Sequence, residues 1–132
     1  KKASDPHWIL PLITGLLDDD TRFHMIAVDD IAWFAADVFA HPEEFVGQHL
    51  DVASDVLTAA EMKAVYRKVT GRRVPPSSKM LTRLLLRLLN PESARQFVWN
   101  NAVGWHFDIA PLRQRHPGLT SFETFLRQHL NA

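Results

Sequence analysis

The sequence predicts an α/β fold in which helices outnumber strands. Residues 23–72 show strand-like and helix-like patterns in the order strand, helix, strand, helix. Such alternation is typical of a mostly parallel sheet that is covered by helices. The remaining segments are mostly helical in pattern, and a chain of 132 residues is long enough to bury a substantial core. We therefore expect one helix-rich domain, residues 1–132, with two to three short strands.

Two strands are expected, at residues 23–28 and 48–54, and residues 73–75 are a candidate for a short third. Asp29 or Asp30 can cap the helix that follows the first strand. The body of this helix, residues 31–40, is apolar nearly all round, which predicts burial on most sides. His41 and Pro42 end it or start another turn. Two strands do not make such a sheet by themselves, so we expect their edges to need cover from elsewhere.

Two capping boxes predict two further helices. Thr58 and Glu61 form the first box, and Gly71 closes the helix at a position that favours left-handed backbone. Thr120 and Glu123 form the second box, which opens a C-terminal helix. Three more helical or apolar segments are expected at residues 7–17, 80–89 and 93–103.

The net charge of zero conceals a division between the two halves of the chain. Residues 1–61 hold twelve acidic and three basic side chains, and residues 62–132 hold three acidic and twelve basic ones. The favoured interpretation is that the halves face each other, in one fold or in a dimer. Nucleic-acid binding is disfavoured because such modules usually have an overall basic balance.

Composition excludes some classes of chemistry and suggests a compartment. The chain has no cysteine, so it forms no disulfide and no thiolate site, which fits a reducing cytoplasm. No apolar run approaches the roughly 18 residues of a membrane span. We therefore expect a cytoplasmic protein without a membrane-spanning segment.

Motif spacing argues against the common nucleotide and hydrolase sites. The glycines are too far apart for a dinucleotide loop or a P-loop, since they stand at positions 15, 47, 71, 104 and 118. Neither an H-x-x-x-H zinc helix with its glutamate nor a G-x-S-x-G elbow is present. His106 and Asp108 alternate along the chain, as in a metal or acid–base pair. A histidine that bonds within an aromatic loop is favoured, because no third ligand is evident.

Aromatic and amide side chains gather near the end of the helix expected at residues 93–103. They are candidates for the wall of a ligand cleft, since ligand pockets combine aromatic surface with a few polar groups. Core packing explains the same residues and is the favoured alternative. The candidates are Trp99, Asn100, Asn101, Trp105 and His106.

A basic stripe runs along the leucine-rich helix. Lys79, Arg83 and Arg87 are spaced four residues apart, on the side opposite the leucines. This candidate contact face would suit anionic lipid, a phosphate-bearing ligand or an acidic partner. A solvated face that meets the acidic half of the chain is the favoured alternative.

An ordered set of short motifs resembles the distal half of NmrA-like proteins, which are atypical relatives of the short-chain dehydrogenases. The resemblance covers roughly residues 20–130. It rests on residues 26–31 (IAVDDI), Gly47 before a strand, Leu57-Thr58-x-x-Glu61, Thr70-Gly71-Arg72 and residues 112–123 (LRQRHPGLTSFE).

The resemblance implies a C-terminal, substrate-side portion of an incomplete Rossmann-like fold. Members of the family are NAD(P)-dependent oxidoreductases, among them quinone or enone reductases, or redox-sensing regulators. Their cofactor residues and the catalytic tyrosine–lysine pair of the wider superfamily lie in an N-terminal half. No catalytic, cofactor-binding or metal-binding residue therefore carries over to this chain, and we expect it to bind no NAD(P) alone. Tyr66, the only tyrosine, lies on the apolar stripe of its helix.

Two functional hypotheses follow. In the first, the chain is the substrate-side lobe of such an oxidoreductase or regulator, partnered by the missing Rossmann half. In the second, it is a stand-alone module for small-ligand binding or oligomerisation, in which strand edges pair with a second copy. An independent enzyme is the weakest alternative, because no constellation of residues supports a reaction.

Overall fold

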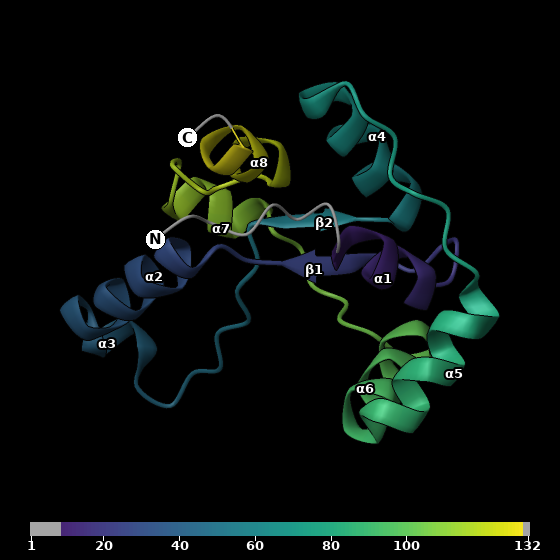
Figure 1. Ribbon diagram of the computed structural model, residues 1–132. Coiled ribbons are helices and arrows are strands. Elements are labelled where there is room, and N and C mark those ends of the chain that lie inside the picture. The colour runs from purple at the N-terminus through teal and green to yellow at the C-terminus, as the bar shows by residue number, and fades with distance from the viewer. Residues whose placement is uncertain (1–8, 131–132) are drawn as a thin grey trace.

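A computed structural model describes residues 9–130 of the chain. Two short strands lie side by side near the centre, with α2 and α3 at one end and the α5–α6 pair at the other (Figure 1). The strands are β1 (Phe23–Met25) and β2 (Asp55–Leu57). The helices are α1 (Ile9–Leu16), α2 (Val28–Ala40), α3 (Pro42–Phe45), α4 (Ala59–Thr70), α5 (Lys79–Leu89), α6 (Pro91–Ala102), α7 (Ala110–Arg115) and α8 (Phe122–Leu130). The expectation of a helix-rich fold with few strands is confirmed.

The sheet differs from the predicted one in direction and position. β1 and β2 pair antiparallel, with Phe23 opposite Leu57 and Met25 opposite Asp55. The expectation of a mostly parallel sheet is therefore wrong for the described residues. The second strand follows residues 48–54 instead of occupying them, and residues 73–75 form no strand.

Backbone pairing explains the shift of the second strand. Ser54 donates its backbone N–H to the carbonyl of Met25 at 2.7 Å, so the ladder starts only there. The residues before Ser54 run without a strand beside them and are irregular. A side-chain alternation describes extended chain, but only an adjacent strand makes that chain part of a sheet.

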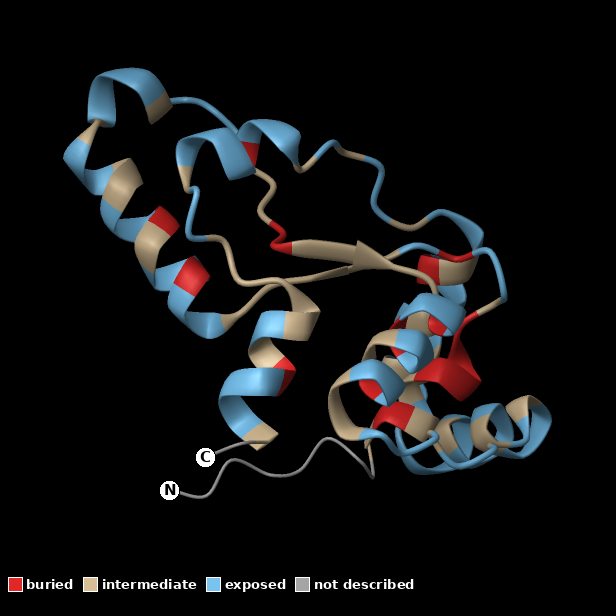
Figure 2. Cartoon of the chain, turned by 90° about the horizontal axis from the view of Figure 1, so that it is seen from above, coloured by how far each residue is buried: buried red, intermediate tan, exposed pale blue. Residues whose placement is uncertain are grey.

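The core lies where α1, α4 and α8 meet the sheet. Tyr66 and Met62 on α4 are each 1% exposed, and Leu126 on α8 is fully buried. Leu10 and Leu17 complete this cluster from the α1 side. Figure 2 shows the buried positions as a minority among exposed and intermediate ones. The helix α2 was expected to be buried on most sides, but only two of its residues, Asp30 and Phe34, are buried.

The predicted capping box of α4 is confirmed, whereas that of α8 is wrong. At α4, both hydrogen bonds of the capping box between Thr58 and Glu61 are present, and Gly71 has φ of 70° in the left-handed region. At α8, Ser121 accepts the backbone N–H of Thr124 at 3.1 Å, so Thr120 is not the cap. The sequence permits either Thr120 or Ser121 as the N-cap residue. The hydrogen bonds that Thr120 makes with Asp30 leave Ser121 as the cap.

The predicted cap of α2 is also wrong. Neither Asp29 nor Asp30 caps the helix, which starts after Ala27 without a side-chain cap. Asp30 is 2% exposed and instead accepts hydrogen bonds from the backbone N–H and hydroxyl of Thr120, at 3.0 and 3.2 Å. A buried carboxylate needs such donors, because burial without hydrogen bonds is costly. Asp30 thus joins α2 to the segment that enters α8.

The acidic and basic halves of the chain face each other, as the favoured interpretation of the charge division expected. Five ion pairs join an acid of the first half to a base of the second. Arg115 forms two of these ion pairs, with Asp37 and with Glu44. Its guanidinium also lies 4.8 Å from the ring centre of Phe45. These contacts hold α7 against α2 and α3.

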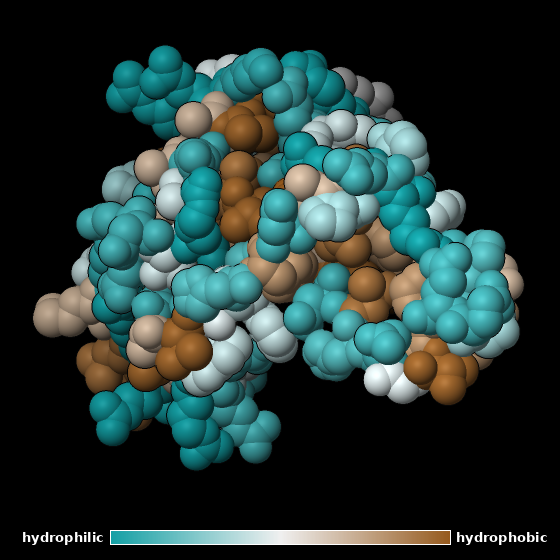
Figure 3. All heavy atoms as spheres, turned by 180° about the vertical axis from the view of Figure 1, so that it is seen from behind, coloured by the Kyte–Doolittle hydropathy of each residue, from teal (hydrophilic) through white to brown (hydrophobic). Residues whose placement is uncertain are grey.

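Helix α5 presents its leucines outward. Six apolar side chains of this helix are 47–80% exposed: Met80, Leu81, Leu84, Leu85, Leu88 and Leu89. After the half-turn from Figure 1, the α5–α6 end lies on the left of Figure 3, where hydrophobic atoms reach the surface. Within residues 9–130, no helix is both long and apolar enough to cross a membrane.

Candidate ligand-binding site

A pocket of about 740 Å³ lies between the sheet and the loop of residues 103–109. We call it the polar pocket. His24 of β1 and Asp55 of β2 line it from the sheet, and Asn100 lines it from α6. Arg113 closes it from α7. Its volume lies within the range of roughly 300–1,000 Å³ that is typical of small-molecule sites.

Three buried polar atoms in the wall of this pocket have no hydrogen-bond partner. They are Nδ1 and Nε2 of His24 and Nδ2 of Asn100. Asn100 is 7% exposed as a whole. Such atoms are rare in folded proteins, and each one costs on the order of 1–3 kcal/mol. All the unpaired buried side-chain atoms found in residues 9–130 therefore belong to one pocket.

The His24 ring lies in the wall of the polar pocket, with both of its nitrogens buried. It packs against the ring of Phe107, with centroids 4.7 Å apart. Burial is the main cause that lowers the pKa of His24 from its ordinary value, and the nearby His106 and Arg22 side chains act in the same direction. The backbone at Phe107 and Arg22 opposes this shift, although neither reaches the geometry of a hydrogen bond. His24 is thus neutral near pH 7, with one ring N–H donor and one acceptor nitrogen.

Asn101 lines the polar pocket but is committed to holding the fold. Its Oδ1 accepts the backbone N–H of Asp18 and the hydroxyl of Thr21, both at 3.1 Å. Its Nδ2 donates to the carbonyl of Leu16 at 2.9 Å. This side chain ties α6 to the turn after α1, so its hydrogen-bonding capacity is largely used within the protein.

The structure brings together four of the five predicted wall residues. Asn100, Asn101, Trp105 and His106 line the polar pocket, whereas Trp99 does not. Trp99 is 40% exposed and packs edge-on against Trp105, with centroids 5.4 Å apart. The turn at Gly104, with φ of 64°, directs Trp105 and His106 to the pocket. A side chain at this glycine would meet the carbonyl of Asn100 at 2.8 Å.

His106 and Asp108 do not form the metal or acid–base pair that their alternation suggested. Nε2 of His106 contacts the carbonyl of Val103, and Asp108 accepts the backbone N–H of Ala110 at 2.9 Å. Within residues 9–130, no three histidine or carboxylate side chains converge on a metal site. The favoured interpretation, a histidine that bonds within its loop, agrees with this geometry.

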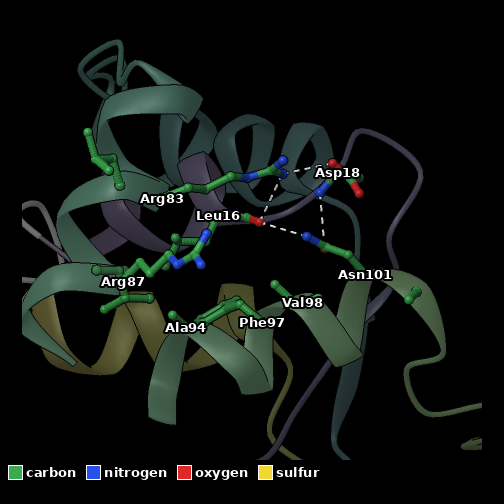
Figure 4. Close-up of a pocket in the computed structure, with 11 residues that line it drawn as sticks. Leu16, Asp18, Arg83, Arg87, Ala94, Phe97, Val98 and Asn101 are labelled. Atoms are coloured by element: carbon green, nitrogen blue, oxygen red, sulfur yellow. Dashed lines mark hydrogen bonds and ion pairs between the residues drawn. The ribbon is translucent and has the colours of Figure 1, made fainter. Parts of the chain in front are cut away.

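The predicted basic face is divided between two environments. Lys79 pairs with Asp19 at 2.6 Å, and Arg83 pairs with Asp18 at 2.7 Å. The pKa of Asp19 is lowered by its hydrogen bond to Lys79. Arg83 and Arg87 both line a second pocket between α5 and α6, where Arg87 has no acidic partner among the described residues (Figure 4). Two of the three cations therefore meet the acidic half, as the favoured alternative expected.

Sequence reasoning did not find His24, Asp55 or Arg113. The signal for His24 was available, since a histidine between Phe23 and Met25 interrupts an apolar strand. Asp55 and Arg113 carried no such signal, because they approach each other only in the folded chain, at 3.7 Å. No protein-family model matches the sequence.

Proposed function

We propose that this chain binds a small, uncharged carbonyl compound in the polar pocket. The unpaired polar atoms of His24 and Asn100 are the observation that carries this proposal. A ligand carbonyl accepts hydrogen bonds from Asn100 Nδ2 and from the ring N–H of His24. Because these atoms are buried, the proposal requires the loop of residues 103–109 to move aside when the ligand binds.

In this proposal the chain is the substrate-side lobe of an NmrA-like oxidoreductase or redox-sensing regulator. The ordered sequence motifs support this assignment, and quinones or enones are the carbonyl compounds that the resemblance implies. A neutral His24 suits an uncharged quinone, because its ring N–H donates to a carbonyl without adding a charge that the ligand would have to balance. The absence of cysteine fits a reducing cytoplasm, where we place the protein.

The described residues do not fit NAD(P). A dinucleotide needs a glycine-rich turn between a strand and the N-terminus of a helix, where backbone N–H groups reach the phosphates. The turn from β1 to α2 contains Ile26 and Ala27 and no glycine. At the start of α4, the carboxylate of Glu61 already occupies the cap. In the proposed role, the cofactor is bound by the partner Rossmann half.

Titration with a simple naphthoquinone tests the proposal, with binding followed by protein NMR shifts and by thermal stabilisation. His24→Phe preserves the ring contact with Phe107, and Asn100→Leu preserves volume, so both variants should fold. Each should weaken binding by about tenfold, the value of one hydrogen bond. His49→Phe is the matched control on an exposed histidine, and it should bind as the unaltered chain does.

Two outcomes would contradict the proposal. Equal binding by all three variants would place the quinone outside the polar pocket. Tight binding of NADH or NADPH by this chain alone would contradict the assignment of the cofactor to a partner.

Association is the second candidate function, and two observations favour it. Each strand of the two-stranded sheet has one edge without a neighbouring strand among the described residues. The outward leucines of α5 form an apolar patch of the kind that marks a partner interface. Light scattering at rising concentration tests this hypothesis, and a clean monomer with a cooperative melt would remove the need for a second copy.

A further inference from the structure

A second pocket, which we call the apolar pocket, lies between α5 and α6 and is floored by the end of α1. Its volume is about 480 Å³. Most of its wall is apolar: Leu16, Leu84, Leu86, Ala94, Phe97 and Val98. Asn101 and Ala102 also line the polar pocket, but His24 and Asn100 are absent from this one. The apolar pocket is therefore suited to a different ligand from the carbonyl compound proposed for the polar pocket.

The polar groups at the rim are already paired, with one exception. Arg83 Nη2 donates to Asp18 at 2.7 Å and to the carbonyl of Leu16 at 3.1 Å. Asn101 donates a hydrogen bond to the same carbonyl and accepts one from the backbone N–H of Asp18. Arg87 has no ion pair or hydrogen bond with any other described residue. The charge of Asp18 is thus balanced, and that of Arg87 is not.

The unpaired charge of Arg87 faces the interior of the apolar pocket. Figure 4 shows its guanidinium directed into the space between α5 and α6, toward Leu16 on one side and Ala94 and Phe97 on the other. A guanidinium with a free planar fork of donors binds carboxylates through paired, charge-assisted hydrogen bonds.

We propose that the apolar pocket binds a fatty carboxylate, with its chain between α5 and α6 and its headgroup on Arg87. One unpaired cation selects one anionic group. The wall formed by Leu84, Leu86, Phe97 and Val98 takes up an unbranched hydrocarbon chain, which has no polar atoms to satisfy. Leu84 belongs both to this wall and to the outward leucines of α5, so a longer chain would leave the pocket beside it.

Calorimetric titration with dodecanoate, below its micelle-forming concentration, tests the proposal. The unaltered chain should bind dodecanoate, and Arg87→Gln should weaken binding at least roughly tenfold through loss of a charge-assisted pair. Glutamine has good helix propensity, so this exposed variant should fold. Arg67→Gln on α4, at another exposed helical arginine, is the matched control and should bind normally.

Two further arms separate the headgroup from the chain and this site from the polar pocket. Dodecanol should bind Arg87→Gln and the unaltered chain equally, because it carries no charge. Ala94→Leu fills part of the pocket and should weaken binding of both ligands. The proposal is overturned if dodecanoate does not bind, or if Arg87→Gln binds it normally. It is also overturned if His24→Phe, at a residue that does not line the apolar pocket, abolishes dodecanoate binding.

Discussion

The two hydrogen bonds from Thr120 to Asp30 should be among the main interactions that hold α2 against the rest of the fold. Asp30→Ala removes both hydrogen bonds from Thr120 and the contact with His116 Nε2 at 3.4 Å. A hydrogen bond to a charged group contributes about 1.5–3 kcal/mol, and relief of the buried charge offsets part of the loss. We expect the free energy of unfolding to fall by about 2–3 kcal/mol. At this chain length, that corresponds to a decrease in Tm of roughly 10 °C.

Urea denaturation followed by circular dichroism measures this change. Asp29→Ala is the matched control, because Asp29 is the adjacent acid in the same helical turn and is exposed. It should cost less than about 1 kcal/mol, mainly through its position near the helix N-terminus. Asp30→Asn keeps one acceptor oxygen and should fall between the two. If Asp30→Ala and Asp29→Ala lose the same stability, the buried bonds of Asp30 do not hold α2 in place.

Three further predictions concern other parts of the fold. Leu126→Ala, at a fully buried position on α8, should lower the free energy of unfolding by about 2–5 kcal/mol in urea denaturation; a loss below 1 kcal/mol would mean that α8 does not pack on α4 as described. Thr58→Ala should cost about 1 kcal/mol in the same assay by removing the cap of α4, whereas an unchanged midpoint would contradict the capping role. Burial lowers the pKa of His24, so below its ordinary value of about 6.5 the unfolded chain binds more protons, and stability should decrease as pH falls from 7 to 5. His24→Phe should make that decrease smaller, and parallel stability curves for the two proteins would refute the assignment to His24.

Local signals in the sequence were sufficient for most of the helices. Thr58, Glu61 and Gly71 identify the start and end of α4, and the structure has both ends as predicted. These signals are reliable because a cap satisfies backbone groups within its own turn, without help from distant residues. The candidate wall was also a local prediction, since all five of its members belong to one short segment around the end of α6, and four of them line the polar pocket.

The remaining features could not be predicted from the sequence, because they depend on contacts between residues that are far apart in the chain. The periodicity of residues 48–54 indicated extended chain, but it contained no information about which segment would lie beside it. The unpaired state of His24 also depends on Phe107 and on Asn100 of α6, both more than 70 positions away in the chain. Sequence reasoning could therefore place His24 on a strand without revealing that its ring nitrogens are buried and unpaired.

The sequence by itself determined a helix-rich α/β chain, the ends of its best-capped helix and the absence of a dinucleotide loop. These features depend on residue type and on spacings of a few positions, which act locally. Only the tertiary structure decided that the strands pair antiparallel, that Asp30 binds Thr120 and that α5 turns its leucines outward. The physical reason is that backbone hydrogen bonds, ion pairs and buried charges are satisfied by groups far away in the chain.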